Sequence, residues 1–179
     1  MASVFSHPAV PLALAVAAGP RLAPPALVTA ACAASVLPDI DALGFFAGVP
    51  YGHPLGHRGF THSLFFALLL ALAAAALSER LGAKPAAAFA VIFLSAASHG
   101  ILDATTTGGL GVAFFSPFSN QRSFLPWRVI VVSPIGVGGF FGSRGLRILA
   151  SELVWVWAPC GAAALLAWTL KRVIVGTSN

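Results

Sequence analysis

The chain has 179 residues, of which 58% are hydrophobic and only 8% are charged, and its formal net charge is +5. A soluble domain typically carries roughly 25% charged residues, so this composition excludes an ordinary cytosolic enzyme and a disordered tail. We therefore expect an integral membrane protein that forms a single domain over residues 1–179.

The first two of five apolar runs cover residues 8–19 and 23–37. Both runs are short for a membrane span, so they could either form a re-entrant hairpin or pack inside the bundle. No Lys or Arg precedes the first run, and we expect it to stay in the mature protein rather than to be removed as a signal peptide. Pro38 is expected to end the second run.

The last three runs cover residues 60–77, 85–102 and 153–170, and each is long enough to cross a bilayer with modest tilt. A connection rich in Gly, Ser, Thr and Pro occupies residues 104–152, and its apolar part at 129–141 could lie in the membrane interface or pack onto the bundle. The expected fold is all-α: a multi-span membrane bundle of about four to five helices, with a long irregular connection before the last helix.

Ionisable side chains are costly beside lipid unless they are paired, so their positions are informative. If consecutive runs cross the membrane in alternate directions, one end of the bundle collects His7, Asp39, Asp41, His53, His57, His62, His99, Asp103 and Glu152. The opposite end then collects Arg21, Glu79, Arg80, Lys84, Lys171 and Arg172. The basic residues are scattered as helix anchors rather than gathered in a stripe, which argues against direct nucleic-acid binding.

Two pairs in the first group have spacings that suit metal binding. His99 and Asp103 are one helical turn apart on one face, so an imidazole and a carboxylate can reach one ion. Asp39 and Asp41 are two residues apart, and in extended backbone both carboxylates point the same way. Each pattern alone has a simpler explanation as a chance spacing or a turn; the joint pattern is what predicts a metal site.

The remaining histidines are expected near the same site. Gly59 lets the chain turn, so His57 can lie on a loop while His62 opens the third run, with Thr61 as a plausible helix N-cap. We include His7 and His57 among the candidate ligands. Glu152 could belong to the same group or pair with an arginine in the connection.

These residues predict a site for one or two divalent ions. The proposed ligands are His62, His99, Asp103 and one of Asp39 and Asp41, a mixed nitrogen and oxygen set that favours zinc over manganese or iron. Such an ion activates water for hydrolysis. In that mechanism Asp41 could act as a general base and Arg58 could neutralise a substrate anion, with help from Arg122 or Arg128.

Three segments of the chain resemble the YdjM-type inner-membrane metal-dependent hydrolases, which are also described as LexA-binding and membrane-associated. The segments are LPDID at 37–41, HRGFTHS at 57–63 and HGILDATT at 99–106. The resemblance implies a multi-pass protein of the inner (plasma) membrane and a possible protein partner. A more distant similarity to zinc-dependent phospholipase C and the zinc-dependent single-strand nucleases implies that His7, one of Asp39 and Asp41, His62, His99 and Asp103 are ligands.

The sequence therefore favours a membrane-embedded metal-dependent hydrolase that acts on a phosphoester or another ester of a lipid or small molecule at the membrane interface. The alternative is a non-catalytic membrane metal-binding scaffold or regulatory protein. Each end of the bundle has five basic residues, those on the histidine side being Arg58, Arg122, Arg128, Arg144 and Arg147. The five at the opposite end lie in short loops or at helix ends, where the positive-inside rule is strongest. We therefore expect the site to face away from the cytoplasm.

Overall fold

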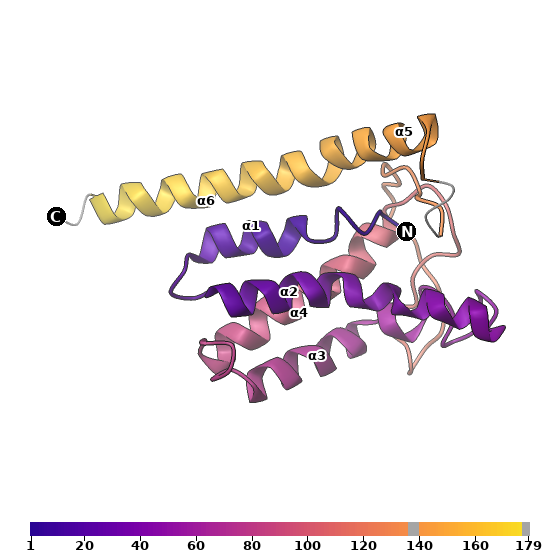
Figure 1. The fold of residues 1–179 in the computed structure, drawn as a ribbon, viewed down its shortest axis with the longest axis horizontal. Helices are drawn as coiled ribbons and strands as arrows, with labels where there is room; N and C mark the ends of the chain where they lie inside the picture. The colour runs from indigo at the N-terminus through magenta and orange to yellow at the C-terminus, as the bar shows by residue number, and fades with distance from the viewer. Residues whose placement is uncertain (136–139, 177–179) are drawn as a thin grey trace.

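The computed structural model describes residues 1–135 and 140–176, with side chains up to residue 173, and confirms the expected all-α class (Figure 1). Within this part of the chain the only β-type pairings are two isolated bridges. The helical elements are α1 (Ala9–Ala18), α2 (Pro25–Val36), η1 (Leu37–Ala47), η2 (Phe60–His62), α3 (Leu64–Ala76), α4 (Pro85–Ala104), α5 (Ser143–Glu152), η3 (Leu153–Trp157) and α6 (Ala158–Gly176).

Helix α4 packs against both α2 and α3 and forms the centre of the bundle. The interface is built mainly from small and aliphatic side chains, namely Leu27, Ala31, Ala34, Ala71, Ala74, Ala88 and Ile92. Small residues let helix backbones approach closely. In a membrane the hydrophobic effect does not drive helices together, so close packing of this kind stabilises the bundle. Proline occupies the first turn of both α2 and α4, where its missing N–H has no intrahelical partner to lose.

Three helical segments are long and apolar enough to span a membrane: Pro25–Ala47, Pro85–Ala104 and Ser143–Val173. The second apolar run was expected to end before Pro38, but a 3₁₀ helix continues it to Ala47. Pro38 lies in the first turn of η1, where proline is tolerated. The run at 60–77 gives only the thirteen residues of α3, because η2 takes up its first turn and Ser63 caps the helix.

The last helix also begins earlier than expected, since α5, η3 and α6 follow one another without a break from Ser143. The irregular connection is therefore shorter than residues 104–152. Its apolar part packs onto the bundle as far as it is described, because Ile130 is buried in a cluster with Ala9 of α1 and Val156 of η3. Ile130 is also tied to the end of α4, since its N–H donates to the Thr105 carbonyl. Residues 136–139 of this part lie outside the described chain.

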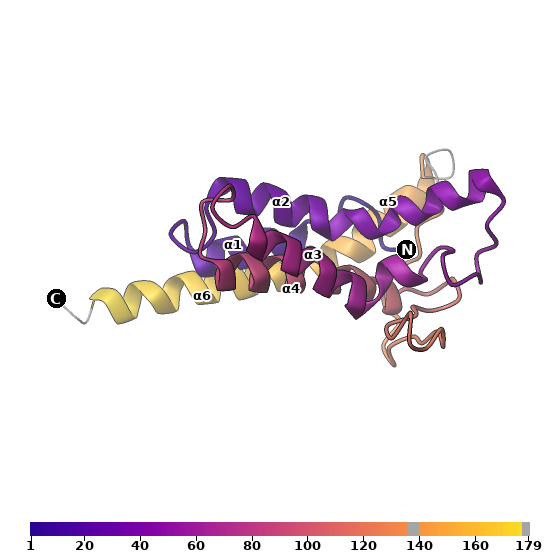
Figure 2. The same ribbon diagram turned by 90° about the horizontal axis from the view of Figure 1, so that it is seen from below.

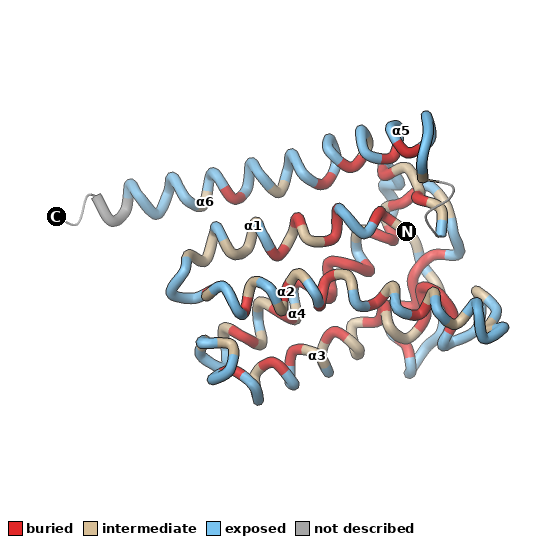
Figure 3. The backbone as a smooth tube through the Cα atoms, viewed as in Figure 1, coloured by how far each residue is buried: buried red, intermediate tan, exposed pale blue. Residues whose placement is uncertain are grey.

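The helices do alternate in direction, as the expected threading requires. The α1–α2 and α3–α4 turns lie at one end, and η1, η2, the C-terminal end of α4 and the start of α5 lie at the other (Figures 1 and 2). Helix α6 returns to the first end, where Lys171 Nζ donates to the Ala18 carbonyl at 2.8 Å. Buried residues gather toward the second end, whereas α6 is mostly exposed (Figure 3).

Candidate metal centre

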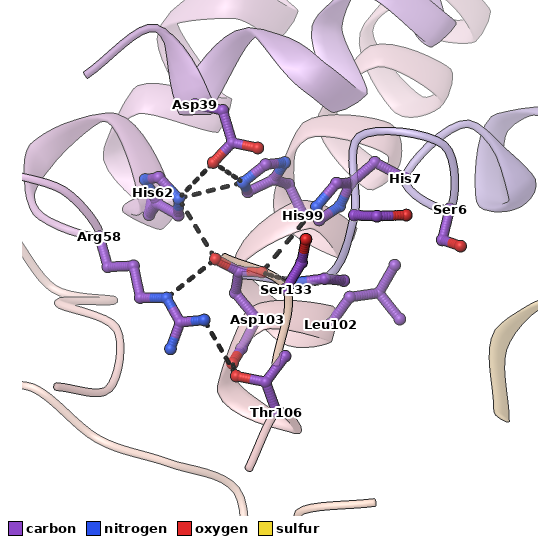
Figure 4. Close-up of polar contacts among 12 residues, drawn as sticks. Ser6, His7, Asp39, Arg58, His62, His99, Leu102, Asp103, Thr106 and Ser133 are labelled. Atoms are coloured by element: carbon purple, nitrogen blue, oxygen red, sulfur yellow. Dashed lines mark hydrogen bonds and ion pairs between the residues drawn. The ribbon is translucent and has the colours of Figure 1, made fainter. Parts of the chain in front are cut away.

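Four side chains from three separate parts of the bundle converge at its second end (Figure 4). They are Asp39 of η1, His62 of η2, and His99 and Asp103 of α4, and one potential ligand atom from each lies within 4.8 Å of all the others. We call these four residues the metal cluster. The helix-turn spacing of His99 and Asp103 thus brings both side chains to one point, as expected.

The helix lengths and directions help to explain this convergence. Asp39 lies three residues after the end of α2, and His62 lies two residues before the start of α3, and these helices have 12 and 13 residues. His99 lies fourteen residues after Pro85 on α4, roughly 21 Å along the helix at 1.5 Å per residue, so all three side chains lie toward the same end of the bundle.

The distances within the cluster suit a four-coordinate ion. His62 Nε2 lies 3.0 Å from His99 Nε2, 3.5 Å from Asp39 Oδ1 and 3.5 Å from Asp103 Oδ2. His99 Nε2 lies 3.4 Å from Asp39 Oδ1. Ligands at about 2.0–2.1 Å from a tetrahedral centre are separated from one another by about 3.3 Å. These four separations are close to the edges of such a tetrahedron, and every pair of ligand atoms lies within 4.8 Å.

Unpartnered polar atoms mark the same point. Among the described residues, both carboxylate oxygens of Asp39 are buried without a hydrogen bond, and Asp103 Oδ2 also makes none, although it pairs with the Arg58 guanidinium at 3.0 Å. A buried carboxylate without a partner is strongly destabilising, so each such atom in a folded protein needs an explanation. A divalent cation between these side chains would supply it, and the donor set fits one.

Asp41 orients His62 rather than facing the cluster centre. Its Oδ2 lies 3.0 Å from His62 Nδ1 and accepts hydrogen bonds from Thr61 Oγ1 at 2.7 Å and from Arg58 N–H at 3.1 Å. Its Oδ1 lies 2.7 Å from His57 Nδ1. A carboxylate only accepts in its ionised form, so in the neutral, ion-binding ring of His62 the proton resides on Nδ1 and the Nε2 lone pair faces the cluster.

His99 is fixed in the same way by the main chain. Its Nδ1 lies 2.8 Å from the Ser35 carbonyl oxygen of α2, which can only accept. The Nδ1 proton is thereby assigned, and Nε2 is left as the ligand atom. A backbone carbonyl carries no mark in the sequence, so this contact could not be predicted.

Electrostatics in the metal-free cluster centre on His62. Burial lowers the pKa of its imidazole, but hydrogen bonds with Asp103, Asp39 and Asp41 outweigh that effect and raise it to about 10. At neutral pH the metal-free ring is therefore protonated and serves as the cation that the three carboxylates share.

His7 lies beside the cluster. Its ring stacks on His99 with centroids 3.7 Å apart, and its Nε2 is 3.9 Å from Asp103 Oδ1. Burial, followed by repulsion from His99, lowers the pKa of His7 to about 3, so the ring is neutral. Glu152 holds this segment in place, because its carboxylate accepts hydrogen bonds from Ser3 and Ser6. The suggested pairing of Glu152 with an arginine is not what the structure shows.

Arg58 is fully buried, which does not match the expected contact with a substrate anion. Its Nε lies 3.0 Å from Asp103 Oδ2, Nη2 donates to Thr106 Oγ1 and Nη1 donates to the Gly108 carbonyl. The residue has a left-handed backbone with φ of 63°. These contacts favour a role in fixing Asp103. The contacts of Thr106 and Gly108 with Arg58 could not be predicted from the sequence, because only the fold brings these residues to the guanidinium group.

His57, another predicted ligand, lies outside the metal cluster but close to it. His57 forms a second group with Asp39, Asp41 and His62, in which one ligand atom from each residue also lies within 4.8 Å of the others. Asp41, however, already meets four hydrogen-bonding groups, which makes this second group the weaker candidate.

The remaining basic and cap residues lie elsewhere. His53 is exposed on a loop, and Arg122 and Arg128 donate to backbone carbonyls instead of reaching the cluster. The predicted N-cap Thr61 bonds Asp41, and Ser63 caps α3 by accepting from Phe66 N–H.

Comparisons with known proteins agree with this architecture. Residues 1–174 match the family described as YdjM inner membrane protein. The inner membrane protein YbcI of Escherichia coli K12 is 39% identical over 173 residues, which cover 96% of this chain and 100% of the relative. No solved structure matches the chain, and the distant similarity to phospholipase C and the nucleases finds no support in these comparisons.

Proposed function

Because this chain belongs to the YdjM inner membrane protein family and lies in the inner membrane, we propose that it is a membrane-embedded metal-dependent hydrolase. The ion we propose is a single zinc held by the metal cluster, and the substrate class is a phosphoester or another ester at the membrane interface. One observation carries the proposal: four side chains place one ligand atom each within 4.8 Å of the others, and both carboxylate oxygens of Asp39 have no hydrogen-bond partner among the described residues.

Two imidazole nitrogens with two carboxylate oxygens are a donor set that suits zinc better than magnesium or calcium, which prefer oxygen alone. A bound zinc ion would lower the pKa of a coordinated water toward about 7 and polarise the scissile bond. The protein supplies the orientation: Asp41 fixes His62, the Ser35 carbonyl fixes His99, and Arg58 fixes Asp103. Asp39 is the least buried of the four ligands, with 11% of its side chain exposed.

His57 replaces Asp41 as our candidate general base. Asp41 Oδ1 engages Nδ1 of His57, which leaves His57 Nε2 buried and without a partner among the described residues. An imidazole oriented by a carboxylate in this way can accept a proton from water. The reaction would then join the water oxygen to the phosphorus or carbonyl carbon, break the bond to the leaving oxygen and return the proton to that oxygen.

Metal content and turnover test the proposal together. We expect purified wild-type protein to hold about one zinc per chain and to hydrolyse a phosphoester or carboxylic ester in a chelator-sensitive manner. His62→Ala and Asp103→Asn should lose both properties, whereas His53→Ala, which removes an exposed histidine, should retain both. Negligible metal in all four proteins would end the proposal.

The non-catalytic scaffold has one observation in its favour. A site closed by four protein ligands is typical of structural zinc, whereas catalytic zinc usually keeps three ligands and one open position. If zinc is bound stoichiometrically, no ester or phosphoester is turned over, and His57→Ala changes neither metal content nor folding, the scaffold is the better description.

A further inference from the structure

An apolar groove of about 360 Å³ runs between α3 and α4 and is not used by the metal cluster. Six of its nine lining residues are phenylalanines, and Ser116 is the only polar one. Helix α3 contributes Leu64, Phe65 and Leu68, and α4 contributes Phe89 and Phe93. In a chain that lies in a membrane, such a groove is bathed by lipid rather than by water.

The groove runs along the depth of the bilayer. Phe89 and Phe93 lie four and eight residues after Pro85, or roughly 6 and 12 Å from the charged end of the bundle. The metal cluster lies roughly 21 Å from that end, against a hydrocarbon thickness of about 30 Å. If the charged end marks one boundary of the hydrocarbon, the cluster lies below the far boundary, and a long acyl chain beside it would lie along the groove.

The upper end of the groove adjoins the cluster. The Leu64 N–H, two residues after His62, donates to the Phe114 carbonyl at 3.0 Å. A Cβ at Gly100, next to His99, would lie 3.4 Å from the Phe114 ring and 2.8 Å from the His62 carbonyl oxygen. Phe114 therefore contacts the backbone beside two proposed metal ligands and also lines the groove.

We propose that this groove holds one acyl chain of a bilayer lipid, so that the ester or phosphoester of the same lipid is presented to the metal cluster. Presentation of the ester to the metal cluster rests on the proposed function. Binding of a lipid in the groove does not, and it is tested by binding measurements alone. The substrate class is then a long-chain membrane lipid rather than a water-soluble ester.

Photolabelling tests occupancy without relying on activity. The probe is a phospholipid with a diazirine in the middle of one acyl chain, added at low molar ratio to the full-length protein in detergent. We expect saturable labelling at Phe65, Leu68 and Phe93, displaced by unlabelled long-chain phospholipid. Leu68→Trp, which fills the groove, should abolish it, whereas Leu72→Trp, an exposed position one turn further along α3 and outside the groove, should not.

Labelling that does not saturate, that is spread evenly along exposed α6, or that survives Leu68→Trp would overturn the proposal. So would protection of the groove by a second copy of the chain. Turnover then separates the two proposals. Loss of long-chain hydrolysis in Leu68→Trp, with short-chain hydrolysis and zinc content retained, supports the lipid substrate. If labelling is saturable but the protein hydrolyses no substrate, the proposed lipid site is supported and the proposed hydrolase activity is contradicted.

Discussion

Asp41 meets four groups from one short segment: the rings of His57 and His62, the hydroxyl of Thr61 and the N–H of Arg58. All four groups lie within residues 57–62, which run from the loop into η2. The carboxylate therefore folds the HRGFTH loop around itself and aims one imidazole into the cluster. Partners of this kind fix ring orientation and raise ligand basicity.

Replacing this carboxylate should weaken metal binding without removing a ligand. We expect Asp41→Asn to lower zinc affinity by about 10- to 100-fold, because an amide cannot accept from both rings and Thr61 at once. Competition against a chromogenic chelator measures the change. Glu79→Gln, at the exposed opposite end of the bundle, is the matched control and should bind zinc like wild type.

The raised pKa of His62 predicts that metal binding releases a proton. The metal-free ring is protonated below about pH 10 and must be neutral to bind an ion. Zinc affinity should therefore increase as pH rises toward 10, and about one proton per ion should be released at pH 8. Calorimetry in buffers of different ionisation enthalpy measures this number, and a heat independent of the buffer would show the assignment to be wrong.

Helix α4 carries two ligands and also comes close to the backbone of η2 at Gly100. A side chain there would meet the His62 carbonyl at 2.8 Å, whereas one at Gly161 of α6 would meet nothing within 4 Å. The first glycine is thus required for the close approach of two ligand-bearing elements, and the second is not.

Gly100→Ala should therefore separate η2 from α4. We expect it to destabilise the protein by about 1–3 kcal/mol and to reduce zinc content, because overpacking at a rigid backbone contact forces the elements apart. Gly161→Ala should be neutral or stabilising by up to about 1 kcal/mol, since alanine favours helix. Thermal unfolding in detergent compares the two, and equal melting temperatures would contradict the account.

Helix alternation and the spacing of His99 and Asp103 were enough to predict where the cluster lies. The sequence could not predict that Asp39 faces the cluster whereas Asp41 orients His62. Both residues precede the same loop, and only the folded path of that loop decides which carboxylate it encloses. The extension of η1 past Pro38 and the early start of α5 were missed for a related reason. Both depend on tertiary packing that the local pattern does not show.

For the molecule as a whole, the charged turns and the histidine cluster lie at opposite ends of the bundle. Arg21, Arg80 and Lys84 lie in or beside short turns, and Lys171 and Arg172 lie near the end of α6. From the positive-inside rule we expect this end to lie in the cytoplasm and the metal cluster toward the other side.

Reporter fusions test this orientation. A fluorescent protein fused after residue 179 should be bright, because it folds in the cytoplasm, and alkaline phosphatase at the same position should be inactive. A loop cysteine introduced at His53 should be labelled from outside in intact spheroplasts by a membrane-impermeant reagent. The reverse pattern in both assays would invert the orientation and place the cluster toward the cytoplasm.

The most direct measurement of the central claim is X-ray absorption at the zinc edge of the purified, zinc-loaded protein. Two imidazole nitrogens and two carboxylate oxygens at about 2.0–2.1 Å are expected, with one imidazole lost in His99→Ala. A shell of water oxygens alone, or a spectrum identical in wild type and His99→Ala, would show that the four side chains do not form a metal site.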